Sequence, residues 1–158
     1  MSTPEENAFE SMVSHHRSMV DELRALTSAL VDDADHGRDV DASSTKLVTY
    51  LNDEVLPHAT AEENSLYRAA AGIPSLSATL PQMIDEHREL ASLTRRLAEA
   101  SSDPATHARA PYTTQIFVLF VTHAAKENDI VLPAVLAEDG VDLSGLLHEM
   151  HSLLAGAT

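Results

Sequence analysis

Four long stretches of this chain repeat apolar residues at the three- and four-residue spacing of an α-helix. Residues at this spacing share one helix face, so each stretch predicts an amphipathic helix that buries that face. The four stripes lie within about residues 3–32, 43–71, 77–100 and 111–136, and the connections between them are short. This pattern favours an all-α fold in which the helices form an antiparallel up-down-up-down four-helix bundle.

The ends of the predicted bundle are also marked. Thr3 is followed by a proline and two glutamates, an order typical of a helix start: a capping hydroxyl, proline in the first turn, and acids near the positive end of the dipole. Asp142 is expected to cap a short fifth helix over about residues 142–155 that packs against the bundle or a partner. We therefore expect a single domain over residues 1–158, with the bundle over about 3–138.

Two further signals concern the connections and the regularity of the helices. Ser101–Pro104 is a predicted turn between the third and fourth helices. Pro57 lies inside the second stripe, where it removes one backbone donor, so a kink is expected in that helix next to His58.

Composition excludes several classes of protein. The chain has 158 residues and no cysteine, so it has no disulfide, thiolate zinc site, iron–sulfur cluster or cysteine nucleophile, and any metal must be bound by nitrogen and oxygen. Its formal charge of -15 argues against nucleic acid and anionic membrane surfaces as partners. The acidic N-terminus does not resemble a signal peptide, and no apolar run approaches membrane-spanning length, so a cytoplasmic protein is expected.

Each apolar stripe contains one histidine, and two of these histidines belong to a repeated motif. His58 is followed after four residues by Glu62, and His123 is followed in the same way by Glu127. Positions i and i+4 lie on the same helix face, one turn apart, so both pairs should point into the core. Burying an ionised carboxylate is costly unless it is paired or binds a metal. The remaining two stripe histidines are His16 and His87.

Mid-helix positions in a bundle can meet at a similar depth, so these four imidazoles and two carboxylates are expected to converge. By ligand chemistry such a set suits iron, manganese or zinc, and six ligands fit two carboxylate-bridged ions better than one tetrahedral zinc. The alternative is that all six are ordinary hydrogen-bonded core residues. That would bury charges costing several kcal/mol each, against a total stability of about 5–15 kcal/mol, so a metal site is the favoured interpretation.

The residues around these positions resemble a known family. The matching segments are His-His-Arg at 15–17, Leu-Pro-His-Ala-x-Ala-Glu-Glu-x-x-Leu-Tyr at 56–67, Glu-His-Arg-Glu-Leu at 86–90, and His-Ala-x-x-Glu-Asn-x-x-x-Leu-Pro at 123–133. Together they resemble the hemerythrin-like family, also called the HHE cation-binding domain, over about residues 12–133. The resemblance implies a four-helix bundle around a non-haem di-iron site with an oxo or hydroxo bridge.

Carried over to this chain, the resemblance also implies which residues bind the two iron ions. Neutral imidazoles and ionised carboxylates are the forms that bind metal. The implied ligands are His16 and His58 for one iron, His87 and His123 for the other, and Glu62 and Glu127 as bridges.

This sequence departs from the oxygen-carrying hemerythrins at two positions. Met83 stands where those proteins have a second histidine on the third helix, and Glu127 follows His123 by four residues where they have an aspartate after five. The site therefore has one more coordination position to fill, by water, peroxide or a side chain. Tyr67 is one such candidate and is equally well explained as a buried anchor at the end of its helix. The other candidates are Glu63 and Glu86, with His15 solvated or just outside the ligands.

The missing histidine favours reactive di-iron chemistry over reversible oxygen carriage. Peroxide decomposition of the catalase type is the leading hypothesis. The alternative is a module that binds or senses oxygen, nitric oxide or iron status without turnover. Ferritin-like di-metal proteins use Glu-x-x-His pairs, and no histidine here has a glutamate three residues before it, so that class is less favoured. The expected partners are small ligands (peroxide, O2 and NO), with the chain a monomer or weak homodimer.

Overall fold

The computed structural model describes residues 2–100 and 108–156, and every regular element in these ranges is helical. The predicted all-α class is therefore confirmed, while the predicted turn at 101–104 lies outside the described residues. The elements in chain order are α1 (Pro4–Asp35), α2 (Asp41–Tyr50), η1 (Leu51–Val55), α3 (Leu56–Asn64), α4 (Leu66–Ala70), η2 (Pro74–Leu76), α5 (Thr79–Glu99), α6 (Arg109–Lys126), η3 (Glu127–Val131), α7 (Leu132–Leu136) and α8 (Leu143–Gly156).

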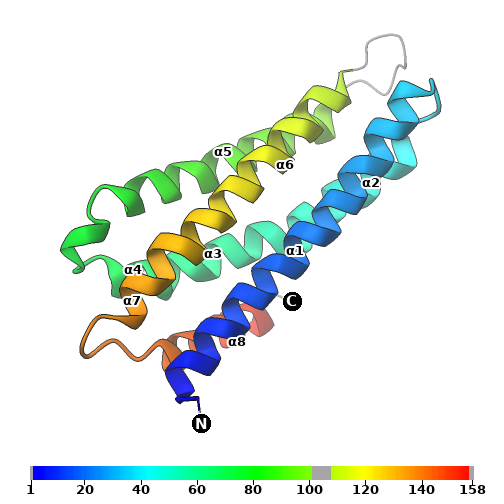
Figure 1. Ribbon diagram of the computed structural model, residues 1–158. Helices are drawn as coiled ribbons and strands as arrows, with labels where there is room; N and C mark the ends of the chain where they lie inside the picture. Colours follow the sequence, from blue (N-terminus) through cyan, green and yellow to red (C-terminus); the bar gives the residue numbers. More distant parts are fainter. Residues whose placement is uncertain (1, 101–107, 157–158) are drawn as a thin grey trace.

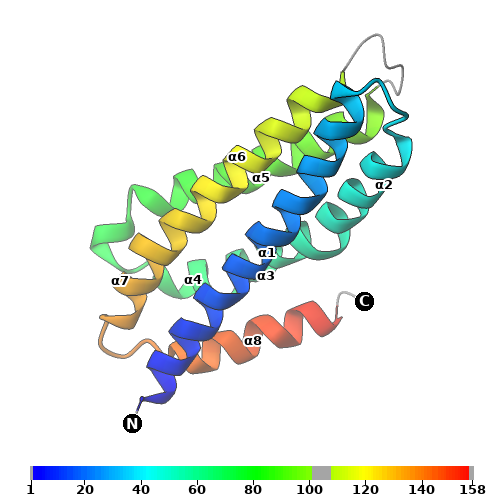
Figure 2. The same ribbon diagram turned by 45° about the vertical axis from the view of Figure 1, so that its right-hand side comes forward.

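The long segments lie side by side as an elongated helical bundle (Figure 1). Helix α1 packs against α6, α2 and α8, and α5 packs against α6, α2 and α3. Helix α8 crosses the outside of the bundle near the N-terminal half of α1 and also contacts α3 and α4 (Figure 2). Of the two options for the fifth helix, packing against the bundle is the one observed.

The predicted helix starts have the expected caps. The Glu6 N–H donates to Thr3 Oγ1 at 3.1 Å, and the Thr3 N–H donates to the Glu6 carboxylate at 2.8 Å, which forms a reciprocal capping box at α1. Asp142 Oδ1 accepts from the Gly145 N–H at 2.8 Å and so caps α8. Both caps satisfy backbone donors that have no partner inside the helix.

Two of the predicted helices are not continuous. The predicted helix over 43–71 consists of α2, the π-helical turn η1, α3 and α4, and the predicted helix over 111–136 consists of α6, the π-helical turn η3 and α7. Sequence periodicity missed these interruptions because one π turn adds only one residue to an otherwise helical pattern.

Each π turn ends at a Leu-Pro dipeptide, which explains its position. The Leu56 N–H donates to the Leu51 carbonyl and the Leu132 N–H to the Glu127 carbonyl, five residues back in both cases. The prolines that follow have no N–H to donate, so the normal four-residue pattern is already interrupted there. The disturbance expected at Pro57 is thus a π turn, and Pro133 produces a second one that was not predicted.

The core consists of two apolar clusters with a polar layer between them. One cluster lies toward the N-terminal end of α1 and the other toward its C-terminal end. On α1, Met12 belongs to the first cluster and Met19 to the second, and His16 lies between them. The same order recurs on the other long segments, so the histidines form one layer across the bundle.

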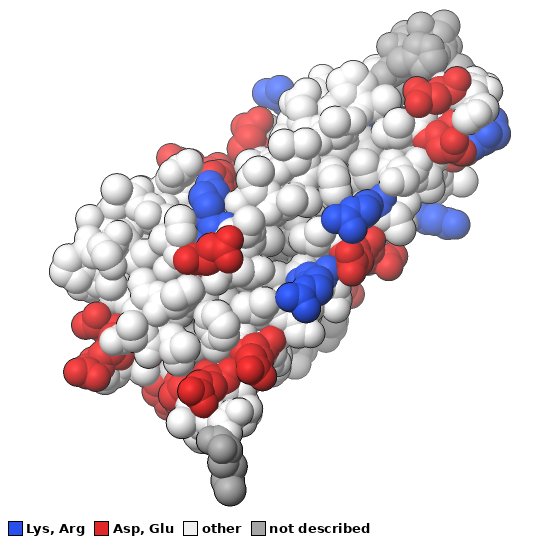
Figure 3. All heavy atoms as spheres, in the orientation of Figure 1, with Lys and Arg blue, Asp and Glu red and all other residues white. Residues whose placement is uncertain are grey.

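Acidic side chains gather near both ends of the face in Figure 3, whereas the surface over α6 is largely uncharged. Residues 110–125 contain no lysine, arginine, aspartate or glutamate. Within the described ranges, no helix is long and apolar enough to cross a membrane.

Candidate metal centre

All six predicted ligands are buried and meet in the polar layer between the two apolar clusters. Each of the six residues is at most 6% exposed. They come from four long segments: His16 from α1, His58 and Glu62 from α3, His87 from α5, and His123 and Glu127 from α6 and the first position of η3.

One group of potential ligands consists of His16, His58 and Glu62, whose candidate ligand atoms lie within 4.8 Å of one another. Glu62 Oε1 is 3.2 Å from His16 Nε2 and 2.8 Å from His58 Nε2. The two Nε2 atoms are themselves 3.2 Å apart. Three atoms that can bind a cation therefore point at one small volume.

A second group contains His87, His123, Glu127 and again Glu62, within the same 4.8 Å limit. His87 Nε2 is 2.9 Å from His123 Nε2, and Glu62 Oε2 is 3.5 Å from His87 Nε2. Glu62 thus contributes one oxygen to each group. Glu127 also reaches across, because its Oε2 is 3.5 Å from His16 Nε2.

The hydrogen bonds behind the imidazoles test whether a metal fits. His87 Nδ1 is 2.8 Å from Glu63 Oε1, and His123 Nδ1 is 2.9 Å from Glu86 Oε2. An ionised carboxylate can only accept, so each Nδ1 carries the proton and each neutral ring has its lone pair on Nε2. These two lone pairs face each other at 2.9 Å, an arrangement that a cation between them makes favourable.

The first group has the same orientation. His16 Nδ1 donates to the Asn128 side-chain carbonyl at 2.7 Å, which leaves the lone pair of its Nε2 directed at His58 and Glu62. His58 Nδ1 is buried and has no hydrogen-bond partner among the described residues. Lone pairs and carboxylate oxygens therefore converge in both groups, and the donor set fits metal ions.

Without a cation, protons compensate the buried charge. Burial opposes protonation of His16, but hydrogen bonding to Glu62 and the charge of Glu127 outweigh it and raise the pKa of His16 to about 9. Burial likewise opposes ionisation of Glu62, but the charge of His58 and hydrogen bonds from the surrounding histidines hold the pKa of Glu62 well below its ordinary value. Metal binding at this cluster therefore has to displace protons.

Tyr67 reaches the ligand atoms directly. Its hydroxyl donates to Glu127 Oε1 and lies 3.3 Å from His123 Nε2, and its ring stacks on the His87 ring with centroids 5.5 Å apart. Burial and then the charge of Glu127 raise the pKa of Tyr67 far above its ordinary value. Tyr67 is placed by a break between α3 and α4 at Ser65, a break that apolar spacing did not predict.

The other predicted neighbours of the centre lie farther from the ligand atoms. Glu63 and Glu86 bind the Nδ1 atoms, behind the imidazoles. His15 is exposed, with its ring 5.0 Å from the His58 ring. Met83 is fully buried in the same apolar cluster as Tyr67.

Two residues at the centre were missed from the sequence. Asn128 binds His16, and Lys126 forms an ion pair with Glu86. Both lie beside Glu127 in the chain, so adjacency to the His-x-x-x-Glu motif was the available signal. Partial burial opposes ionisation of Glu86, but hydrogen bonds from Lys126 and His123 outweigh it and lower the pKa of Glu86.

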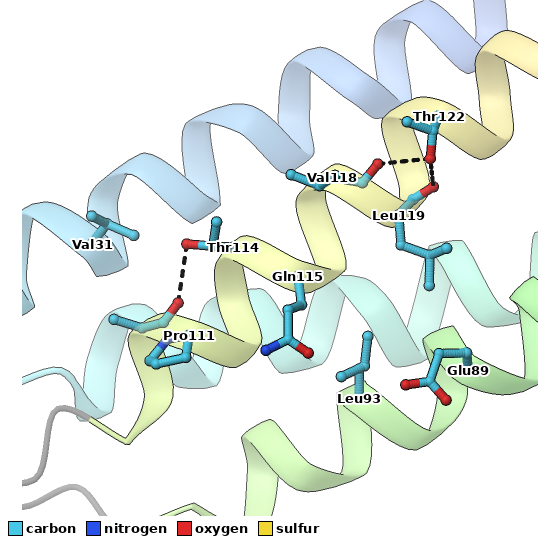
Figure 4. A pocket seen from close by; sticks show the side chains of 10 residues that line it. Val31, Glu89, Leu93, Pro111, Thr114, Gln115, Val118, Leu119 and Thr122 are labelled. Atoms are coloured by element: carbon cyan, nitrogen blue, oxygen red, sulfur yellow. Dashed lines mark hydrogen bonds between the residues drawn. The ribbon is translucent and has the colours of Figure 1, made fainter.

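A cavity under α8 and a groove along α6 differ in whether they adjoin the potential metal ligands. A small, partly open cavity of about 120 Å³ lies under α8, and its lining includes His16, His58, Met12 and Met150. A larger, shallow groove of about 880 Å³ follows α6 and is lined mainly by uncharged side chains such as Val118 (Figure 4). None of the six potential ligands lines the groove, so the cavity is the one that adjoins the centre.

A helical bundle with a buried layer of imidazoles and carboxylates defines a protein of the cation-binding class. The chain matches the hemerythrin HHE cation-binding domain over residues 7–135, and it belongs to this family. The matched range contains all six potential ligands. No significant match is found among curated proteins or among solved structures.

Proposed function

We propose that this chain is a non-haem di-iron protein whose bundle follows the antiparallel four-helix arrangement, with α8 as the added fifth helix. In this proposal His16 and His58 bind one iron, His87 and His123 bind the other, and Glu62 and Glu127 bridge them. The observation that carries the proposal is the sharing of Glu62: its Oε1 faces His16 and His58, and its Oε2 faces His87. A shared carboxylate between two groups of ligands is what a two-metal site requires.

We propose that the reaction is the decomposition of peroxide, in which two H2O2 give O2 and two H2O. When bound, the iron pair supplies the two-electron redox capacity for this reaction. The side chains bind and orient the pair, and their burial keeps bulk water away from it. A missing histidine at Met83 favours this reaction over oxygen carriage, because it leaves a coordination position without an imidazole.

Tyr67 has the position of a hydrogen-bond donor beside the centre. Its raised pKa keeps the proton on the hydroxyl, which contacts both Glu127 and His123. Tyr67 would thus hold a proton beside the ligand atoms of the centre and could donate a hydrogen bond there. In this proposal Tyr67 acts as a hydrogen-bond donor beside the centre rather than as a metal ligand.

Metal content is the first test. Protein from iron-supplemented cells is expected to contain about two iron ions per chain, the number that one six-ligand di-metal site implies. Protein that binds only stoichiometric zinc, or no metal, contradicts the di-iron proposal. The matched control is Glu138→Ala, which changes an exposed acid outside the centre and should leave iron content unchanged.

The reaction is tested by measuring oxygen release after adding peroxide to iron-loaded protein. We expect turnover in the parent protein, and a slower rate in Tyr67→Phe at equal iron content. If no oxygen is released while O2 or NO gives stable adducts in the visible spectrum, the chain is a binding or sensing module and the enzymatic proposal is wrong.

A further inference from the structure

The two halves of the centre differ behind their imidazoles. In one half, His87 and His123 each donate from Nδ1 to a carboxylate, at 2.8 Å from Glu63 and 2.9 Å from Glu86. In the other half, His16 donates to the neutral amide of Asn128 at 2.7 Å. His58, in that same half, has no partner for its buried Nδ1 among the described residues.

This difference changes how strongly each pair of imidazoles binds a cation. A carboxylate that accepts the Nδ1 proton increases the electron density on Nε2 and fixes the direction of the ring. An amide carbonyl orients the ring but carries no net charge, and an unpartnered Nδ1 does neither. The His87–His123 half therefore has the stronger donors.

The ligand count and the surroundings point in the same direction. The group around His87 and His123 has four potential ligand atoms within 4.8 Å of one another, whereas the group around His16 and His58 has three. Lys126 holds the other oxygen of Glu86 and so fixes that carboxylate in place, although it also offsets part of its charge. The His16–His58 half instead adjoins the small, partly open cavity under α8.

We propose that Glu63 and Glu86 make the two metal positions unequal, so that the His87–His123 position fills first and retains its ion longer, while the His16–His58 position is exchangeable. Glu63 and Glu86 are positioning residues in this proposal, because they act on the metal through the imidazoles. The proposal rests on the di-iron centre proposed above and adds an order of occupation to it. A one-metal form of the protein would therefore have its ion between His87 and His123.

The test is anaerobic calorimetric titration of metal-free protein with ferrous iron. We expect two binding events, the tighter at least about tenfold stronger than the weaker. The double variant Glu63→Gln/Glu86→Gln replaces both carboxylates with amides of the kind that His16 already contacts. It should weaken the tight event by about 10–100-fold and leave the weak event unchanged.

Matched variants assign the events and test the reverse change. Glu89→Gln alters an exposed acid on the same helix as Glu86 and should change neither event. Asn128→Asp gives His16 a carboxylate partner and should strengthen the weak event. His58→Ala should retain the tight event, and His123→Ala should lose it, with helical content followed by circular dichroism to confirm that each variant is folded.

The possible outcomes separate this inference from the proposed function. Two equal events in the parent protein, or a tight event that survives His123→Ala but not His58→Ala, overturn the inequality and leave a di-iron centre standing. Absence of iron binding in the folded parent protein overturns the di-iron centre itself.

Discussion

The two His-x-x-x-Glu motifs are alike in sequence but lie in different local structures. His58 and Glu62 lie together in α3, which follows the π turn η1 and its Leu-Pro dipeptide. His123 lies near the end of α6, and Glu127 is the first residue of the π turn η3, whose Leu-Pro dipeptide comes afterwards. The proline therefore precedes the motif in one case (Pro57) and follows it in the other (Pro133).

This difference gives the two carboxylates different neighbours. Glu62 has contacts with His16, His58 and His87, so it lies at the centre of the polar layer. Glu127 is held by the Tyr67 hydroxyl and is 3.6 Å from the histidine of its own motif. Equal spacing in the sequence thus does not make the two motifs equal in the site, and Glu62 should matter more for metal binding.

The largest expected effect comes from removing each carboxylate in turn. Glu62→Ala should lose both iron ions, because Glu62 belongs to both groups of ligand atoms. Glu127→Ala should retain about one iron per chain, at the stronger His87–His123 position, because Glu62 remains there beside both imidazoles. Metal analysis of the folded variants compares them, and equal loss in both would show that the two carboxylates are equivalent.

Replacing Pro57 or Pro133 by alanine restores a backbone N–H, and the two replacements should affect iron binding unequally. Pro57→Ala permits η1 to relax to an α-helical turn, which would rotate both ligands of α3 by about 100° relative to α2. We expect iron affinity to fall roughly tenfold in Pro57→Ala. The fall should be smaller in Pro133→Ala, where the change follows Glu127. Iron titration of both variants measures this, and a larger loss in Pro133→Ala would contradict the role assigned to the two prolines.

Tyr67→Phe isolates the contact that distinguishes Glu127 from Glu62. The variant removes a hydrogen bond to a buried carboxylate, so metal-free protein should lose about 1.5–3 kcal/mol of unfolding free energy. Iron content should be unchanged. Urea denaturation gives the free energy, with Tyr112→Phe on α6 as the control, and an unchanged stability would mean that Glu127 does not depend on this hydroxyl.

A smaller effect is expected from pH on metal-free protein. Burial opposes protonation of His16, but hydrogen bonding to Glu62 and the charge of Glu127 outweigh it and raise the pKa of His16 in the fold from its ordinary 6.5 to about 9. Protonation of His16 therefore stabilises the fold fully below about pH 6.5. This contribution is lost as the pH rises through about 9. Denaturation of metal-free protein should therefore become easier between these values, whereas iron-loaded protein should not show this trend. A flat profile without metal would contradict the pairing of His16 with Glu62.

The all-helical class and the convergence of the six potential ligands could be predicted because both depend on helical spacing. The apolar stripe places His16, His58, His87 and His123 on inward faces, and the four-residue spacing adds the two glutamates. A π turn adds a single residue that apolar spacing does not reveal, and within this turn Ile130 is 45% exposed while the next residue, Val131, is buried. The contact between Asn128 and His16 was missed because it joins residues 112 positions apart, and adjacency to Glu127 was the one signal for it.

We propose that six residues of this chain hold two metal ions as one bridged pair. Mössbauer spectroscopy combined with magnetic susceptibility on protein loaded with ⁵⁷Fe tests it most directly. Two iron ions joined by Glu62 and Glu127 should be magnetically coupled, and the diferric protein should have a diamagnetic ground state. A single iron per chain, or two uncoupled high-spin ferric ions, would contradict the account.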